Sequence, residues 1–186
     1  MDEQVDDVAL VARAQAGDRE AFNLLVNRYY DVVVSAAFSV LANIESARDC
    51  AQEAFLEAAR TLDRLRDQAK FAQWIYGISR NKAIYFLQRQ KMHNEALKVK
   101  CDESRRLQPV QSPSDHAREE ERLAGIRQAL DELPPIYREV LVLKYADGRS
   151  HADISNLLDI SLAAVDKRLM RGKDMLRESL TRWKAE

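Results

Sequence analysis

SHADISNLLDISLAAVDKRLMRGKDML, residues 150–176, determines how the C-terminal part of this chain folds. Its apolar residues recur every three or four positions, which predicts two amphipathic helices. Ser150 can cap the first helix and Ser161 the second, and Asp159 stands at the turn, where a left-handed backbone is expected. Helix, tight turn and helix in this order are typical of a helix-turn-helix. Its predicted core is Ile154, Leu157, Leu158, Ile160, Val165 and Leu169.

The second of these helices is a candidate for binding duplex DNA. With Val165 and Leu169 turned inward, its exposed side carries Lys167, Arg168, Arg171 and Lys173. Long cations suit phosphates and guanine edges in a major groove. A solvated basic face on an ordinary helical hairpin is the alternative. Asp166 favours that alternative, unless it accepts from a cytosine amine, pairs with a neighbouring cation or lies off the interface.

The rest of the chain shows the same helical spacing and no strand-like alternation. Of its 186 residues 46% are hydrophobic and 32% charged, with five Gly and four Pro, as in a helix-rich globular protein. Residues 92–117 are polar and contain Pro109 and Pro113, which is typical of a linker. We therefore predict an all-α protein with two small helical domains, residues 1–91 and 118–186, joined by a flexible linker. The C-terminal domain contains the helix-turn-helix.

Charge is segregated along the chain although the formal net charge is only −1. Residues 1–59 hold eleven acidic residues against four arginines, whereas residues 60–91 hold eight basic residues against two acidic ones. Residues 161–186 are also basic, with seven basic against four acidic residues. Two separate basic patches suggest two contacts with a polyanion.

The basic stretch FAQWIYGISRNKAIYFLQRQK, residues 71–91, also carries aromatic residues on both sides of its predicted helix. Duplex phosphates need only cations, so the aromatics suggest stacking on unpaired bases, worth roughly 1–3 kcal/mol per base. The alternative is a helix buried in the middle of its domain, with the charged ends of its side chains reaching outward. The sequence leaves both open.

The helix predicted to begin near Ser46 has two distinct faces. Its inner stripe is regular and belongs to the core: Ala47, Cys50, Ala51, Ala54, Phe55, Ala58 and Leu62. The opposite face carries Asp49, Gln52, Glu53 and Leu56. Acidic residues around an exposed leucine indicate a docking face for a basic protein surface. A merely solvated acidic face is the alternative.

Several function classes lack support in the sequence. His93, His116 and His151 have no catalytic partner at useful spacing, and no glycine-rich phosphate-binding motif is present, so we expect no enzyme and no cofactor. Cys50 and Cys101 lie far apart without a CxxC motif, which predicts free thiols and no metal site. We also expect no membrane span and, because the N-terminus is acidic, no signal peptide, which predicts a cytoplasmic protein.

Three segments in order resemble the extracytoplasmic-function (ECF) group of bacterial sigma factors. They are ARDCAQEAFLEAARTLDRLR (47–66), FAQWIYGISRNKAIYFLQRQ (71–90) and the stretch from LDELPP to GKDML (130–176). The resemblance covers about residues 6–91 and 118–182. It implies a region 2-like domain (1–91) that docks on RNA polymerase and melts the minus-ten element, a linker (92–117), and a region 4-like domain (118–186) that reads the minus-thirty-five duplex.

The resemblance also implies partners and roles. The partners are core RNA polymerase, promoter DNA both duplex and melted, and an anti-sigma factor. The resemblance assigns docking on core RNA polymerase to Asp49, Gln52, Glu53 and Leu56. The minus-ten candidates are Arg64, Arg66, Lys70, Trp74, Tyr76, Arg80 and Asn81. The minus-thirty-five candidates are Ser161, Ala164, Lys167, Arg168, Arg171 and Lys173. Asp166 departs from the family, in which a basic residue is common at this position.

Two rival functions stay open at this point. A dimeric helix-turn-helix regulator would bind palindromic duplex tightly without polymerase. An interaction protein that uses the helix-turn-helix only as scaffold would show no salt-dependent DNA affinity.

Overall fold

The structure, a computed structural model, describes residues 6–98, 125–126 and 128–183, and every regular element among them is helical. The N-terminal unit, residues 6–98, comprises α1 (Asp7–Gln15), α2 (Arg19–Leu41), α3 (Ile44–Thr61), the 3-10 turns η1 (Leu62–Arg64) and η2 (Gln68–Lys70), and α4 (Phe71–Lys98). The C-terminal unit, the described residues from 125 onward, comprises a helical segment ending at residue 132, α6 (Pro135–Tyr145), α7 (His151–Leu158) and α8 (Leu162–Trp183). The predicted all-α class is confirmed.

Local capping determines where the N-terminal helices begin. The Asp18 carboxylate accepts hydrogen bonds from the backbone N–H groups of Glu20 (3.0 Å) and Ala21 (3.1 Å), as predicted for a helix start here. Asn43 caps α3 in the same way, by accepting from the backbone N–H of Ser46 at 2.9 Å. Directly before Asn43, Ala42 adopts the left-handed conformation at φ 53°, which ends α2 and reverses the chain.

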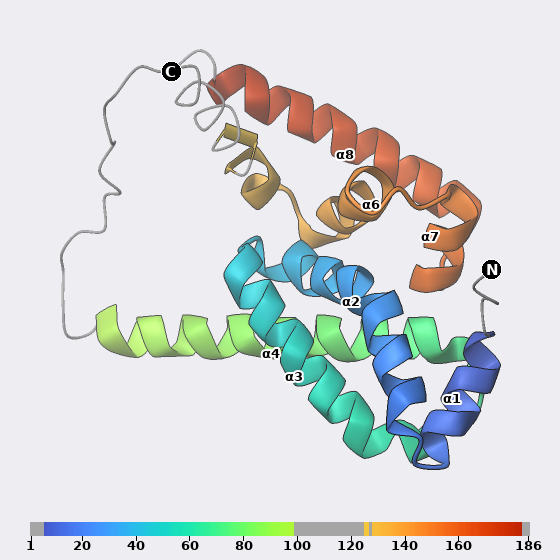
Figure 1. Cartoon of the computed structure of the whole chain (residues 1–186). Helices are drawn as coiled ribbons and strands as arrows, with labels where there is room; N and C mark the ends of the chain where they lie inside the picture. Colours follow the sequence, from blue (N-terminus) through green and yellow to red (C-terminus); the bar gives the residue numbers. More distant parts are fainter. Residues whose placement is uncertain (1–5, 99–124, 127, 184–186) are drawn as a thin grey trace, which may run out of the picture.

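α2 is the central helix of the fold, in contact with α1, α3, α4 and α6 (Figure 1). By length and composition alone α2 could cross a membrane, whereas no membrane span was predicted from the sequence. Half of that apolar stretch is buried inside the protein, so burial in a core accounts for its composition. The inner stripe predicted for α3 is buried against this core in full: Ala47, Cys50, Ala51, Ala54, Phe55, Ala58 and Leu62.

The helix-turn-helix forms as predicted from its caps. Ser150 and Asp153 make a reciprocal capping box at the start of α7. Asp159 adopts the left-handed conformation at φ 52°, and the Ser161 hydroxyl accepts from the backbone N–H of Ala164 at 3.2 Å. Val165 is fully buried on the inner side of α8.

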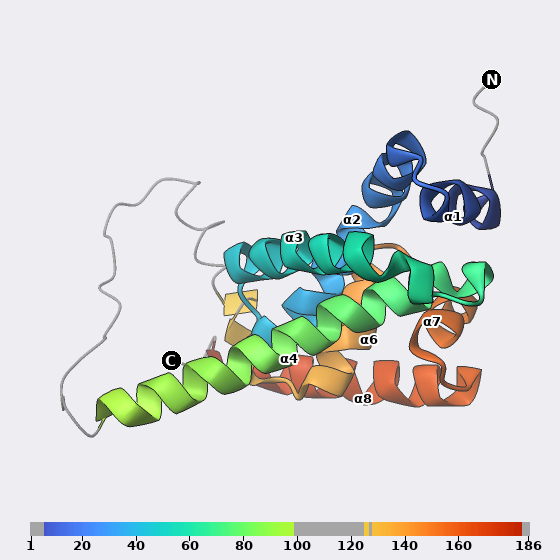
Figure 2. The same ribbon diagram turned by 90° about the horizontal axis from the view of Figure 1, so that it is seen from below.

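The two units pack directly against each other, which the sequence did not indicate. α6 lies between α8 and α2 (Figure 1), and α4 runs across the molecule between α3 and α8 when it is viewed from below (Figure 2). Val32, Ala36 and Tyr76 of the N-terminal unit share one apolar core with Val140 and Leu143 of α6. α4 also continues past residue 91 to Lys98, into the stretch assigned to the linker. Most of the predicted linker, residues 99–117, lies outside the described residues.

Candidate nucleic-acid interface

The outward face of α3 displays the predicted docking residues. Asp49, Gln52, Glu53 and Leu56 are all exposed, and Leu56 leaves 59% of its surface in solvent. Lys82 of α4 lies beside this face, 2.9 Å from the Glu57 carboxylate and 3.9 Å from that of Glu53. The part of the face that holds Asp49 keeps its negative charge, so it is the better candidate for a basic partner.

The turn before α4 presents three of the predicted DNA contacts on an ordered backbone. Arg64, Arg66 and Lys70 are exposed there. The Gln15 side chain of α1 donates hydrogen bonds to the backbone carbonyls of Leu62 and Leu65, both at 2.9 Å. The turn is therefore tied to α1, and its cations project from a fixed position.

The start of α4 is anchored by aromatic packing. Phe71 is 1% exposed, and its ring lies 5.4 Å from that of Tyr29 and 6.0 Å from that of Trp74. Trp74 is half-buried and Asn81 is exposed. Trp74 thus packs against Phe71 and keeps part of its surface open, as a stacking platform requires.

A groove between α3 and α4 is lined by several residues that were not predicted from the sequence to belong to the site. It has a volume of about 430 Å³, and its lining includes Asn81, Lys82, Tyr85, Phe86 and Arg89. Tyr85 is 66% exposed and Phe86 41% exposed. Ala83 is fully buried and Leu87 packs against the same core, so the buried side of α4 continues past these two rings without including them. Exposed aromatics next to cations are the combination that binds single strands.

Cys50 lies in the wall of this groove as a buried free thiol. Burial raises the pKa of Cys50, and the negative charges of Glu53 and Asp49 add to that effect. A thiol held protonated is a poor nucleophile, so this environment makes Cys50 less reactive than an exposed thiol. Cys101 lies outside the described residues.

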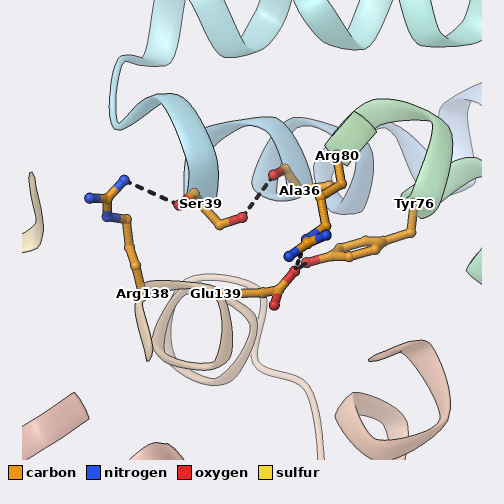
Figure 3. A network of polar contacts seen from close by, with 6 residues as sticks. All are labelled: Ala36, Ser39, Tyr76, Arg80, Arg138 and Glu139. Carbon is orange, nitrogen blue, oxygen red and sulfur yellow. Dashed lines mark hydrogen bonds and ion pairs between the residues drawn. The ribbon is translucent and has the colours of Figure 1, made fainter. Parts of the chain in front are cut away.

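Tyr76 and Arg80, two of the predicted minus-ten residues, point toward Glu139 of α6 (Figure 3). The Tyr76 hydroxyl donates a hydrogen bond to Oε1 of Glu139 at 2.8 Å, and Nε of Arg80 donates to the same oxygen at 3.1 Å. Tyr76 is 3% exposed. Burial raises the pKa of Tyr76 well above its ordinary value, and the Glu139 charge raises it further. In this arrangement Tyr76 is not available to DNA, whereas the Arg80 side chain is paired with Glu139 but still 36% exposed.

Arg138 is a second buried charge on α6 that the sequence did not single out. It is 4% exposed, and burial lowers the pKa of its guanidinium. Its guanidinium donates to five backbone carbonyls: Leu130 (2.7 Å), Asp131 (2.8 Å), Leu133 (2.9 Å), Ser39 (3.1 Å) and Val40 (3.4 Å). The last two lie at the C-terminal end of α2, so one side chain joins the two units.

The predicted DNA-reading helix, α8, has its cations in different environments. Ser161, Lys167 and Arg171 are exposed, whereas Ala164 and Arg168 are half-buried. Lys173 is held over the ring of Tyr145, with Nζ 5.3 Å from the ring centre. Lys167, Arg171 and Lys173 are therefore the exposed cations among the predicted residues, and Lys173 also contacts a ring.

Asp166 has a specific partner. Its carboxylate lies 2.7 Å from Nδ1 of His151, the first residue of α7. Of the roles open to Asp166, pairing with a neighbouring group is the one observed. Within the part of the chain that the structure describes, three or more acidic, His or Cys side chains do not gather anywhere as metal ligands would.

Comparison with known proteins identifies the family. The family model for Sigma-70 region 2 matches residues 25–92, and that for Sigma-70, region 4 matches residues 123–176. The ECF RNA polymerase sigma-E factor of Escherichia coli (strain K12) is 31% identical over 182 residues, covering 95% of each chain. The chain belongs to the ECF RNA polymerase sigma factors. SigW of Bacillus subtilis (strain 168), an ECF RNA polymerase sigma factor, is 31% identical over 91% of this sigma factor and 94% of its own length.

Solved structures agree with this assignment. CnrH, solved in complex with the cytosolic domain of CnrY, superposes with a TM-score of 0.64 at 28% identity, over 94% of this sigma factor and 97% of that chain. The sigma factor RpoE of Bartonella quintana, solved with the anti-sigma factor NepR, shares the fold, with a TM-score of 0.60 at 21% identity over 86% and 96% of the two chains. Sigma factors initiate transcription by binding core RNA polymerase and promoter DNA, so the reading as a dimeric regulator is not supported.

Proposed function

We propose that this sigma factor docks on core RNA polymerase through the outward face of α3, with Asp49, Gln52, Glu53 and Leu56 as the contact residues. An exposed leucine within an acidic surface offers both apolar area and charge complementarity to a basic partner. Asp49 contributes most to this complementarity, since Lys82 neutralises the side of the face nearer α4.

Promoter opening is assigned to the turn before α4 and to α4 itself. Arg64, Arg66 and Lys70 bind backbone phosphates, and Trp74 stacks on a base that has left the duplex. Tyr76, Arg80 and Asn81 complete the minus-ten site. The observation that carries this assignment is the partly exposed Trp74 near the start of α4, together with the exposed cations of the preceding turn.

α8 is assigned to the minus-thirty-five duplex. Lys167 and Arg171 lie on its exposed face and reach guanine edges or phosphates, and Arg168 and Lys173 flank them. Ser161 and Ala164 allow the start of the helix to approach the groove closely. Residues 118–186 are the region 4-like part of the chain, and residues 1–91 the region 2-like part, with 92–117 between them.

Control by an anti-sigma factor and a cytoplasmic location complete the proposal. Both follow from similarity: CnrH was solved with a cytosolic partner domain, and that sigma factor is 28% identical to this chain over most of its length. The chain itself acts as an initiation factor and carries out no catalysis.

Core docking is tested by charge reversal. Asp49→Lys should weaken the complex with core polymerase at least tenfold, whereas Glu178→Lys, an equal charge change on α8, should leave it unchanged. The measurement is fluorescence anisotropy of labelled sigma factor titrated with core enzyme. Equal effects of the two variants on the affinity for core polymerase would show that α3 is not part of the docking site.

Base capture is tested with Trp74→Ala in the complex with core polymerase. Losing one stacked base should weaken binding of a fork-junction minus-ten probe by about tenfold or more and leave binding of the closed duplex unchanged. The matched control is Trp183→Ala, which removes the same side chain from the end of α8. A Trp74→Ala variant with the wild-type preference for the fork junction would show that α4 does not capture a base.

A further inference from the structure

Asp166 is an acidic residue on the helix that is assigned to the minus-thirty-five duplex. Val165, its neighbour in the chain, is fully buried, whereas Asp166 lies on the outward side of α8 with 62% of its side chain exposed. The exposed cations Lys167 and Arg171 share this outward side. A carboxylate among these cations repels the phosphates that they attract. Asp166 therefore lowers the affinity of α8 for duplex DNA of every sequence, unless a particular base compensates for it.

The side chains one turn before and one turn after Asp166 are apolar and exposed. They are Leu162 and Met170, with 53% and 60% of their surfaces in solvent. Residues four apart share one face of a helix, so the three side chains form a single stripe on α8. Apolar side chains on such a stripe suit the methyl groups of thymine in a major groove. The stripe thus has the composition of a surface that contacts base edges as well as phosphates.

His151 holds the Asp166 carboxylate from the neighbouring helix. α7 packs against α8 (Figure 1), and His151 is the first residue of α7. Nδ1 of His151 lies 2.7 Å from Oδ1 of Asp166, and this is the one partner of Asp166 among the described residues. Both side chains are exposed, so their contact adds little to the stability of the fold. Its effect is to restrict where the carboxylate points, while the second carboxylate oxygen remains for a ligand.

The four bases differ in what their major-groove edges offer to a carboxylate. Guanine presents two acceptors there, and thymine presents an acceptor and a methyl group, so neither can donate a hydrogen bond to it. Adenine presents a donor beside an acceptor, whereas cytosine presents its N4 amino group alone. An ionised carboxylate only accepts hydrogen bonds, and it therefore fits cytosine best.

We propose that Asp166 is a specificity-determining residue that selects cytosine at one base pair of the minus-thirty-five element, and that His151 is its positioning residue. The proposal rests on the assignment of α8 to that element. The N4 amino group of the cytosine donates to Asp166, and Lys167 and Arg171 bind phosphates or guanine edges beside it. A base pair without a donor at this place leaves the carboxylate desolvated and unpaired, which weakens binding. Asp166 thus lowers the affinity for other sequences more than the affinity for the preferred one.

Single-base variants of one promoter duplex test the role of Asp166. The probes carry the minus-thirty-five region upstream of a start site mapped in vitro, and their affinities are measured for the full sigma factor in complex with core polymerase. At one position the wild type should bind cytosine at least fivefold more tightly than any other base. Asp166→Ala should lose the preference at that position alone, and it should bind the duplexes with the other bases more tightly than the wild type does.

Asp166→Asn should change the preferred base instead of removing the preference. An asparagine side chain both donates and accepts, which matches the N6 and N7 groups of adenine, so the preference should move from cytosine to adenine at the same position. The matched control is Asp174→Asn. Asp174 is an exposed carboxylate about two turns further along α8 that pairs with Arg177 on its own helix, and its loss should change no base preference. If both Asp166 variants keep every base preference of the wild type, Asp166 reads no base and the proposal is overturned.

His151 is tested by the same ratio of affinities for two bases. His151→Ala should reduce the cytosine preference at least twofold, because the carboxylate is no longer held in place. His151→Asn, whose amide nitrogen can replace Nδ1, should keep the preference. The ratio compares two DNAs bound by one protein, so a smaller folded fraction does not change it. If His151→Ala keeps the full preference, His151 does not position Asp166.

This proposal and the assignment of α8 fail in distinguishable ways. If no base change in the minus-thirty-five region alters the affinity of the wild-type complex, and Arg171→Ala leaves that affinity unchanged, α8 does not bind the element and the role of Asp166 fails with it. If Arg171→Ala weakens binding but the Asp166 variants keep every base preference, only the role of Asp166 is wrong.

Discussion

Replacing Arg138 with methionine tests whether one side chain supports both units. Met has a similar length and apolar stem but no donors, so Arg138→Met leaves five carbonyls without their guanidinium partner. At about 1 kcal/mol for each lost hydrogen bond, less the desolvation cost that the charged arginine no longer incurs, the free energy of unfolding should fall by about 3–5 kcal/mol. That is a large part of the 5–15 kcal/mol typical of a folded protein.

The measurement is equilibrium urea unfolding followed by far-ultraviolet circular dichroism. With a denaturant dependence of about 2 kcal/mol per molar, the midpoint for Arg138→Met should fall by about 1.5–2.5 M. Arg138→Lys, which keeps the charge but cannot span the carbonyls, should lie between wild type and Met. Arg177→Met on the exposed side of α8 serves as control, with a change within 0.5 kcal/mol. A loss below about 1 kcal/mol for Arg138→Met would refute the reasoning.

Three further predictions concern single side chains. Hydrogen bonding from the backbone of Ala21 lowers the pKa of Asp18 in the folded protein. The ionised cap therefore stabilises the fold above pH 4, and this stabilisation is lost as the pH falls through the lowered pKa. Asp18→Ala should reduce the melting temperature at pH 7 and have little effect near pH 2. Burial raises the pKa of Asp147, whose Oδ2 has no hydrogen-bond partner, so its ionised form destabilises the fold at neutral pH. Asp147→Asn should raise the melting temperature at pH 7 and lose this advantage near pH 4, where the carboxyl becomes protonated in both states. Arg171→Ala should reduce by about one the slope of log affinity against log salt for minus-thirty-five duplex, and an unchanged slope would mean that Arg171 contacts no phosphate.

Local elements of this fold were predictable because their causes are local. The caps at Asp18 and Ser150 and the turn at Asp159 depend on residues within one helical turn, which the sequence displays directly. The buried stripe of α3 was predictable for the same reason, since helical periodicity alone specifies which side faces the core. The docking residues on α3 were predicted to be exposed because they lie opposite that stripe, and they are. The residues of the turn before α4 were predicted from the family resemblance instead, and they too are exposed.

The contact between the units was not predictable in this way. Arg138 and Glu139 sit in an amphipathic helix with ordinary spacing, where charged residues are usually solvated. Their partners Ser39, Tyr76 and Arg80 are 59 to 99 residues away along the chain, and no pattern of short period connects them. Exposed aromatics such as Tyr85 were not selected for a related reason: the aromatic pattern of α4 does not specify which of its side chains α2 and α3 cover.

The two interpretations of α4 that the sequence left open describe different parts of the same helix. α2 and α3 cover one side of α4, and α6 covers Tyr76 on the other side. Tyr85 and Phe86 stay exposed in the groove between α3 and α4, whose lining also includes Lys82 and Arg89. Burial therefore accounts for Phe71 and Tyr76, whereas the later rings keep the exposed aromatic surface next to cations that base stacking requires.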